Sequence, residues 1–185
     1  LHGGTIGTIF AIWLFARRHK LSFLRMCDYI ACVIPFGLFL VRLANFANGE
    51  LWGRVTDVSW AIRFNEKING TYMLGPPRHP SQLYEAAMEG VLMAAIMWPL
   101  FWKTDARYKP GFLFGTAALI YGLSRFTLEF FREPDVQLQW LADQTGLSMG
   151  QWLTIPMIVL GLFLVATASR RRQRVEPIAG SDSVA

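Results

Sequence analysis

Long apolar runs constrain the fold of this chain more than any other feature of its sequence. The runs comprise residues 3–16, 29–46, 82–102, 111–131 and 149–168. A helix needs roughly 20 mainly apolar residues to cross the hydrocarbon core of a bilayer. Hydrophobic residues make up 53% of the chain, so apolar runs of this length are difficult to bury in a small soluble domain. We therefore expect an all-α, polytopic integral membrane helix bundle with about five transmembrane helices.

The segments between the runs suggest how the chain is organised. Residues 51–80 form a long stretch of mixed character, so we expect an outer-face loop or arm there instead of a simple turn. Residues 175–185 are polar and are expected to form a disordered cytoplasmic tail after one transmembrane domain at 1–174. Because the chain starts with Leu1 and enters an apolar run at once, we also expect a fragment that lacks earlier helices.

The basic residues predict an orientation. Eleven of the 18 Lys and Arg residues fall in the first linker, the 103–109 linker and the segment after the fifth run. Cytoplasmic segments of membrane proteins carry an excess of Lys and Arg, so these segments are predicted to be cytoplasmic. The net charge of +5 is therefore explained by membrane orientation, and we expect no nucleic-acid partner.

Several ionisable residues share one predicted depth. Counted at 1.5 Å per residue from the cytoplasmic helix ends, His2, Arg42, Glu89 and Arg125 all come out about 20 Å up. Charged groups inside a membrane are costly and usually face a bundle interior or a watery cavity. This layer predicts a functional site in the outer half of the membrane. The alternative is a set of ion pairs that only hold the helices together.

Helical spacing groups further polar residues with this layer, each set on one face of its predicted helix. The sets are Arg42 with Asn45, Gln82 with Glu85 and Glu89, and Tyr121 with Arg125, Glu129 and Arg132. Two arginines in an outward-opening cavity suggest an anionic ligand, because guanidinium binds phosphate in a bidentate manner. Cys27 and Cys32 have no metal-ligand partners in the sequence, so we expect no metal ion and no cofactor. Glycines at positions 3, 7, 111 and 115 have the spacing of close helix packing.

At these residues the sequence resembles the prolipoprotein diacylglyceryl transferases of bacteria. The matching motifs are His2-Gly3-Gly4, the segment from Arg42 to Arg54, the segment from His79 to Glu85, Tyr121 to Arg125, Arg132 to Asp135, and Gly150-Gln151-Trp152. The chain departs from the family at Val41 and Ala44, where glycine is usual. It resembles the C-terminal two thirds of the family, whose members have about seven helices.

The resemblance implies an enzyme that transfers the diacylglyceryl group of phosphatidylglycerol to the lipobox cysteine of a preprolipoprotein signal peptide. It also implies a multi-pass protein of the bacterial inner membrane, with its active site toward the outer leaflet, its C-terminus in the cytoplasm, and membrane lipids as partners. The catalytic residues expected at the matching positions are His2, Arg42, Arg125 and Tyr121. Those expected to bind substrate are Arg42, Asn45, Asn48, Glu50, Gly53, Gln82, Glu85, Arg125, Glu129 and Arg132.

Other functions fit parts of the same pattern. A transporter or channel with an outward-facing charged vestibule is the main alternative, but its pathway should continue inward, and the cytoplasmic halves of the runs are almost wholly apolar. An intramembrane hydrolase is a second alternative, although no serine nucleophile motif is present. The identity of the general base stays open between His2 and Glu50.

Overall fold

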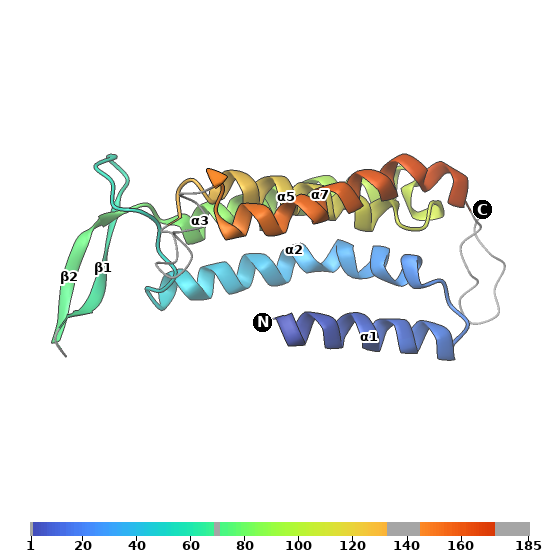
Figure 1. Cartoon of the computed structure of the whole chain (residues 1–185), viewed down its shortest axis with the longest axis horizontal. Helices are drawn as coiled ribbons and strands as arrows, with labels where there is room; N and C mark the ends of the chain where they lie inside the picture. Colours follow the sequence, from blue (N-terminus) through green and yellow to red (C-terminus); the bar gives the residue numbers. More distant parts are fainter. Residues whose placement is uncertain (1, 69–70, 133–144, 173–185) are drawn as a thin grey trace. The chain divides into compact units, whose positions relative to one another are not determined.

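The computed structural model describes residues 2–68, 71–132 and 145–172 and is mainly helical (Figure 1). Its helical elements are α1 (His2–Arg18), α2 (Phe23–Ala47), α3 (Ser81–Glu85), the π-helix η1 (Ala86–Leu92), α4 (Met93–Lys103), η2 (Asp105–Tyr108), α5 (Phe112–Leu128), α7 (Met149–Thr167) and η4 (Ala168–Arg171). Three continuous helical segments, Phe23–Ala47, Ser81–Lys103 and Met149–Arg171, are long and apolar enough to cross a membrane. Helix α5 is apolar but shorter. The predicted class of helical membrane protein is confirmed.

The described residues of the loop at 51–80 form strands and turns and no helix, so the all-α description was incomplete. It contains the antiparallel hairpin of β1 (Ile62–Ile68) and β2 (Thr71–Arg78), in which Ile62 pairs with Arg78 and Glu66 with Met73 (Figure 1). The pairing shifts between Arg63 and Asn65, which marks a bulge. The predicted tail at 175–185 lies outside the described residues.

The described residues group into two compact units, which we treat separately. The first comprises residues 2–34, 94–119 and 159–172, and the second comprises 35–68, 71–93, 120–132 and 145–158. Helices α2, α4, α5 and α7 contribute residues to both units.

A buried carboxylate organises the first unit. Asp28 of α2 is 1% exposed, and its two oxygens accept hydrogen bonds from the backbone N–H groups of Gly111 and Phe114, each at 2.7 Å. These N–H groups lie at the start of α5 and have no partner within the helix, so Asp28 caps a helix distant in sequence. Arg171 donates from Nε to the carbonyl of Pro110 at 2.8 Å.

These contacts explain why the predicted start of the second helix was wrong. We expected the second helix to begin at residue 29, after the charged residues, but it begins at Phe23 and includes Arg25 and Asp28. Both side chains are at most 2% exposed. A buried, bonded charge can lie within a helix, whereas the sequence suggested a polar linker.

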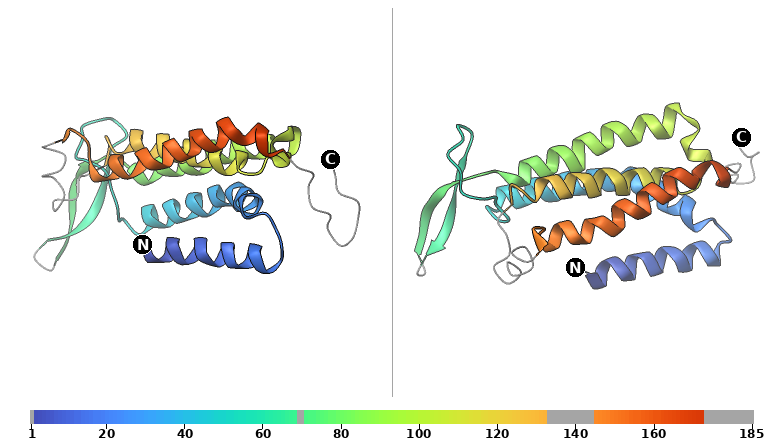
Figure 2. Two further views of the ribbon diagram at one scale, coloured as in Figure 1. Left: turned by 45° about the vertical axis from the view of Figure 1, so that its right-hand side comes forward. Right: turned by 45° about the horizontal axis from the view of Figure 1, so that its top comes forward.

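Close glycine contacts bring α5 and α7 together in the first unit. A Cβ added at Gly115 would lie 2.8 Å from Leu164 Cβ, and one at Gly161 would lie 2.8 Å from the carbonyl oxygen of Gly115. The two helices run side by side in both views of Figure 2. The predicted packing role is therefore confirmed at Gly115, whereas Gly3 and Gly7 have no described atom within 4 Å of such a Cβ.

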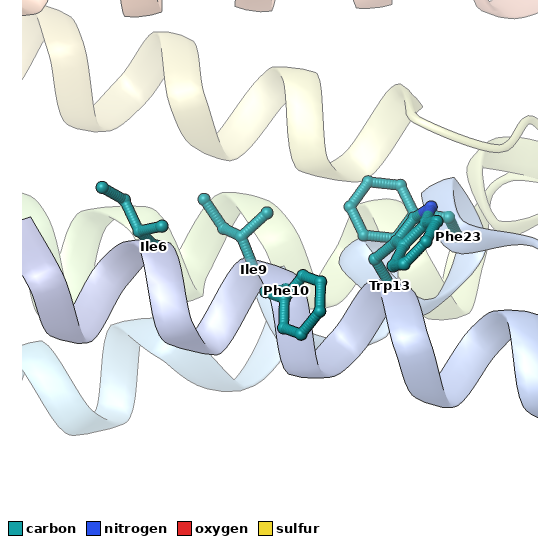
Figure 3. Close-up of a pocket in the computed structure, with 5 residues that line it drawn as sticks. All are labelled: Ile6, Ile9, Phe10, Trp13 and Phe23. Carbon is teal, nitrogen blue, oxygen red and sulfur yellow. The ribbon is translucent and has the colours of Figure 1, made fainter.

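The first unit also contains an apolar hollow of about 420 Å³ beside α1 (Figure 3). Its lining residues are Ile6, Ile9, Phe10, Trp13 and Phe23. None of them carries a charged or nucleophilic group, so the hollow lacks the chemistry of a reaction site.

Aromatic packing anchors the hairpin in the second unit. Phe64 of β1 is 6% exposed, and its ring lies 5.9 Å from that of Phe46 and 5.8 Å from that of Trp52. Arg78 of β2 donates to Glu66 at 2.9 Å and lies over the Trp52 ring. The base of the hairpin is thus fixed to the end of α2 and the loop that follows it.

Candidate functional site

Two arginines and a bridging glutamate form the centre of a charged cluster in the second unit. Glu85, at the end of α3, contacts Arg42 of α2 through Oε2 at 3.1 Å from Nε. Its other oxygen, Oε1, accepts a hydrogen bond from Nη1 of Arg125 on α5 at 2.5 Å. One carboxylate therefore joins guanidinium groups from two different helices.

Two further glutamates complete the cluster. Glu89 of η1 accepts from Nη2 of Arg42 at 3.3 Å, and Glu129 lies 3.5 Å from Nη2 of Arg125. Three carboxylates thus face two guanidinium groups, which gives a formal charge of −1 if all are ionised. Because each arginine has two carboxylate neighbours, these ion pairs orient both side chains.

The arginines are more accessible than the carboxylates between them. The Arg42 and Arg125 side chains are 13% and 15% exposed, whereas those of Glu85 and Glu89 are 3% and 0% exposed. The Glu129 side chain is also 13% exposed, so the accessible part of the cluster comprises both guanidinium groups and one carboxylate, while the other two carboxylates are buried. A guanidinium has five N–H donors, so each arginine keeps donors that its carboxylate contacts do not use.

The π-helix η1 supports this arrangement. A π-helix has wider turns than an α-helix and often occurs at functional sites. Glu85 directly precedes this segment and Glu89 lies within it, and both contact Arg42. Gly90 allows η1 to approach α2, because an added Cβ would lie 2.7 Å from Phe39 Cβ. The contact between two helices thus sets the distance from the glutamates to Arg42.

Other predicted site residues surround the end of α2. Gln82 is 0% exposed and donates from Nε2 to the Glu50 carbonyl at 2.7 Å. Asn48 donates to the Glu50 side chain at 3.2 Å, and Glu50 is exposed. The Gln82 bond connects the start of α3 to the loop after α2, so Gln82 positions the backbone of that loop, whereas the Asn48 bond lies within the loop.

Gly53 and Arg132, both predicted to bind substrate, pair with each other through their backbones. They form an isolated antiparallel bridge, and the Arg132 carbonyl accepts a hydrogen bond from Arg54 Nε at 2.8 Å. A Cβ at Gly53 would lie 2.6 Å from the Phe131 carbonyl oxygen, so only glycine fits this close backbone approach. The described contacts of Gly53 and Arg132 are made by their backbone atoms.

Three predicted residues have fewer described contacts. Tyr121 of α5 lies within electrostatic range of Glu89, Arg125 and Arg42, and its hydroxyl makes no hydrogen bond with a described residue. The Asn45 side chain is half-buried and likewise has no described hydrogen bond. His2 begins α1 in the first unit, and its side chain is outside the described part of the structure.

Sequence reasoning missed Ser148. Its hydroxyl donates to Glu129 Oε1 at 3.0 Å, and it also takes part in the hydrogen bonds that start α7. The signal that could have found it is the spacing Ser148-x-x-Gln151, which is typical of a helix N-terminus.

The fold and the cluster define a helical membrane protein with a charged site built from its apolar helices. Comparison with known families is more specific: the family model described as prolipoprotein diacylglyceryl transferase matches residues 1–167. The chain belongs to this family.

Individual relatives agree with this assignment. The chain is 51% identical over 176 residues to a protein of Erythrobacter litoralis named phosphatidylglycerol–prolipoprotein diacylglyceryl transferase, covering 95% of this chain and 61% of that protein. It is 53% identical over 170 residues to a protein of the same name from Zymomonas mobilis, with 92% and 57% covered. One from Idiomarina loihiensis is 47% identical over 171 residues, with 92% and 60% covered. The chain thus spans about three fifths of the length of these relatives.

Proposed function

We propose that the protein containing this chain transfers the diacylglyceryl group of phosphatidylglycerol to the lipobox cysteine of a preprolipoprotein. In this reaction the cysteine sulfur forms a bond to the glycerol carbon that carries the phosphate. The carbon–oxygen bond to the phosphate breaks, its electron pair leaves with glycerol phosphate, and the thiol proton passes to a base. The products are a thioether-linked lipoprotein precursor and glycerol phosphate.

The observation that carries this proposal is the pair of guanidinium groups held by Glu85. Arg42 and Arg125 keep unused donors, and both are partly accessible. A phosphodiester is an anion whose oxygens accept hydrogen bonds from guanidinium groups. As the carbon–oxygen bond breaks, negative charge grows on the leaving phosphate, and two preoriented arginines stabilise that charge. Their positions match the family motifs, which supports the same reading.

The other predicted residues take supporting roles in the proposal. His2 serves as the base for the thiol proton or positions another base, and Tyr121 and Asn45 orient the lipid head group. Glu129 orients Arg125, which it approaches within 3.5 Å. The hydrogen bonds of Asn48, Glu50 and Gln82 support a role in shaping the substrate-binding side of the site.

We further propose that residues 1–174 form one transmembrane catalytic domain of five spans in the bacterial inner membrane. The helices α1 and α5, of 17 residues each, are the two spans added to the three longer ones. The site faces the outer leaflet, where a phospholipid and a secreted peptide can meet, and the C-terminal segment is cytoplasmic. The basic residues after α7 support that orientation.

The proposal is tested by thioether formation on a lipobox peptide, with the purified full-length protein and with phosphatidylglycerol supplied or replaced by phosphatidylcholine. We expect product only with phosphatidylglycerol, and a loss of roughly 100-fold or more in the Arg125→Gln and Arg42→Gln variants. Arg63→Gln is the matched control, because Arg63 is an exposed arginine of the hairpin. Normal turnover in both site variants would exclude the arginine pair as the phosphate site. Absence of any lipid-dependent product would instead favour a channel or a structural role.

A further inference from the structure

The N-terminus of α7 is closed by a reciprocal pair of hydrogen bonds. The Ser148 hydroxyl accepts from the Gln151 backbone N–H at 3.2 Å, and the Gln151 side chain accepts from the Ser148 backbone N–H at 3.0 Å. This is a capping box, which satisfies two donors that the helix cannot pair itself. Gln151 is 4% exposed and donates at 3.4 Å to the Phe126 carbonyl of α5, so the box is also fixed to that helix.

Ser148 has one more hydrogen bond than capping requires. Its hydroxyl donates to Glu129 Oε1 at 3.0 Å while it accepts from Gln151. A hydroxyl has one donor and two acceptor positions, so both bonds form at once. The residue that caps α7 therefore also holds a carboxylate of the charged cluster.

Gly150 leaves the space that this carboxylate occupies. A Cβ at Gly150 would lie 2.7 Å from Glu129 Oε1 and 2.8 Å from Oε2, closer than carbon and oxygen can approach. With Oε1 bonded to Ser148, Oε2 is left facing Nη2 of Arg125 at 3.5 Å. Oε2 has no hydrogen-bond partner among the described residues, so Arg125 is its electrostatic partner in this part of the chain.

We propose that Ser148 and Gly150 are positioning residues of the active site, which act through Glu129 to orient Arg125 toward the lipid phosphate. The proposal rests on the transferase function for its substrate, but its geometry does not depend on that function. It gives a role to the glycine and glutamine of the Gly150-Gln151-Trp152 motif, which neither phosphate binding nor thiol activation uses.

Serine at this position combines two properties that aspartate, another capping residue, separates. Asp caps a helix as well as Ser does, but an ionised Asp cannot donate to Glu129 and would repel it. Thr keeps both the acceptor and the donor. Ala has neither. Helix capping and carboxylate positioning therefore predict different orders of the three variants.

The test compares Ser148→Thr, Ser148→Asp and Ser148→Ala in the full-length protein. We expect Thr to retain the melting temperature and the KM for phosphatidylglycerol of the unaltered protein. Asp keeps the helix cap, so it should lower the melting temperature less than Ala does, but it should raise that KM at least about tenfold, with the KM for the peptide unchanged. Ala should lower the melting temperature and raise the lipid KM. Gly150→Ala should likewise raise the lipid KM, because its added methyl displaces the Glu129 carboxylate.

A second measurement follows Arg125 without any turnover. In ¹⁵N-labelled protein, the side-chain Nε–H resonance of Arg125, assigned by its loss in Arg125→Lys, should shift in Ser148→Asp and stay in place in Ser148→Thr. An unshifted resonance and an unchanged lipid KM in Ser148→Asp would overturn the inference, as would a KM that only follows the melting temperature across the three variants. If the unaltered protein forms no thioether, the transferase proposal fails, and the resonance alone decides whether Ser148 positions Arg125.

Discussion

At the scale of single residues, Glu85 is the group on which the positions of both arginines depend. It is 3% exposed at its side chain and contacts Arg42 and Arg125 through different oxygens. Removing one partner from a buried ion pair typically costs about 3–5 kcal/mol, because the remaining charges stay buried without compensation. The arginines are partly exposed, so we expect a smaller loss of stability here.

We predict that Glu85→Gln lowers kcat/KM for phosphatidylglycerol at least about tenfold, although it makes the cluster more positive. If net charge alone governed lipid binding, the same change would lower the KM for the lipid. Kinetics at varied lipid concentration distinguish these outcomes. Glu66→Gln is the matched control, since it breaks the ion pair with Arg78 in the hairpin at 2.9 Å. A tighter lipid KM with unchanged kcat in Glu85→Gln would contradict a positioning role.

The sequence predicted much of the cluster at this scale because helix geometry is regular. Counting depth placed Arg42, Glu89 and Arg125 in one layer, and the structure shows Arg42 paired with Glu89. Helical spacing also placed Glu85 on the face of Glu89. It could not show that Glu85 bridges two arginines, because that depends on distances between helices. Ser148 was missed because its bond to Glu129 crosses 19 residues of sequence.

At the scale of elements, η1 shows how local backbone geometry sets the site. Seven residues, Ala86–Leu92, are π-helical between the α-helical segments α3 and α4. Such segments are rare and often mark functional sites. The contact of Gly90 with Phe39 keeps η1 against α2, and Glu89 precedes this glycine directly. A side chain at position 90 would therefore push η1 and α2 apart, and we expect this to move Glu89 away from Arg42.

We predict that Gly90→Ala reduces transfer activity at least about tenfold and lowers the melting temperature, since overpacking a tight contact typically costs about 1–3 kcal/mol. Gly37→Ala is the matched control on α2, because a Cβ there meets no described atom within 4 Å. Activity and thermal unfolding of both variants in the same detergent provide the measurement. Equal behaviour of the two variants would show that the close approach of η1 to α2 is unimportant for the site.

The elements that the sequence did not predict depend on contacts between distant segments. The hairpin at 62–78 was expected only as an arm of unspecified structure, since its strands mix polar and apolar residues without clean alternation. The early start of α2 depends on Asp28, whose backbone partners lie 83 and 86 residues away. Periodicity within one segment carries no information about such partners.

At the scale of the whole molecule, the proposed orientation can be tested with single cysteines. The positive-inside rule predicts cytoplasmic positions for Lys20, Lys103 and Arg170 and outer positions for Arg63 and Thr145, and all five residues are exposed in the structure. The background is a variant in which Cys27 and Cys32 are replaced by alanine. The reagent is a membrane-impermeable maleimide applied to intact spheroplasts and, separately, to permeabilised ones.

We predict that the Arg63→Cys and Thr145→Cys variants react in intact spheroplasts, and that the other three react only after permeabilisation. Positions 20 and 63 flank α2, positions 63 and 103 flank the helical segment Ser81–Lys103, and positions 145 and 170 flank α7. A change of side across each pair therefore counts one crossing.

Reaction of 103 and 145 on opposite sides requires that α5, with only 17 residues, also spans the membrane. If 103 and 145 react on the same side, α5 does not cross, and the bundle has fewer than five spans. Complete inversion of the pattern would place the arginine cluster on the cytoplasmic side, away from secreted peptides, and would contradict the proposed reaction.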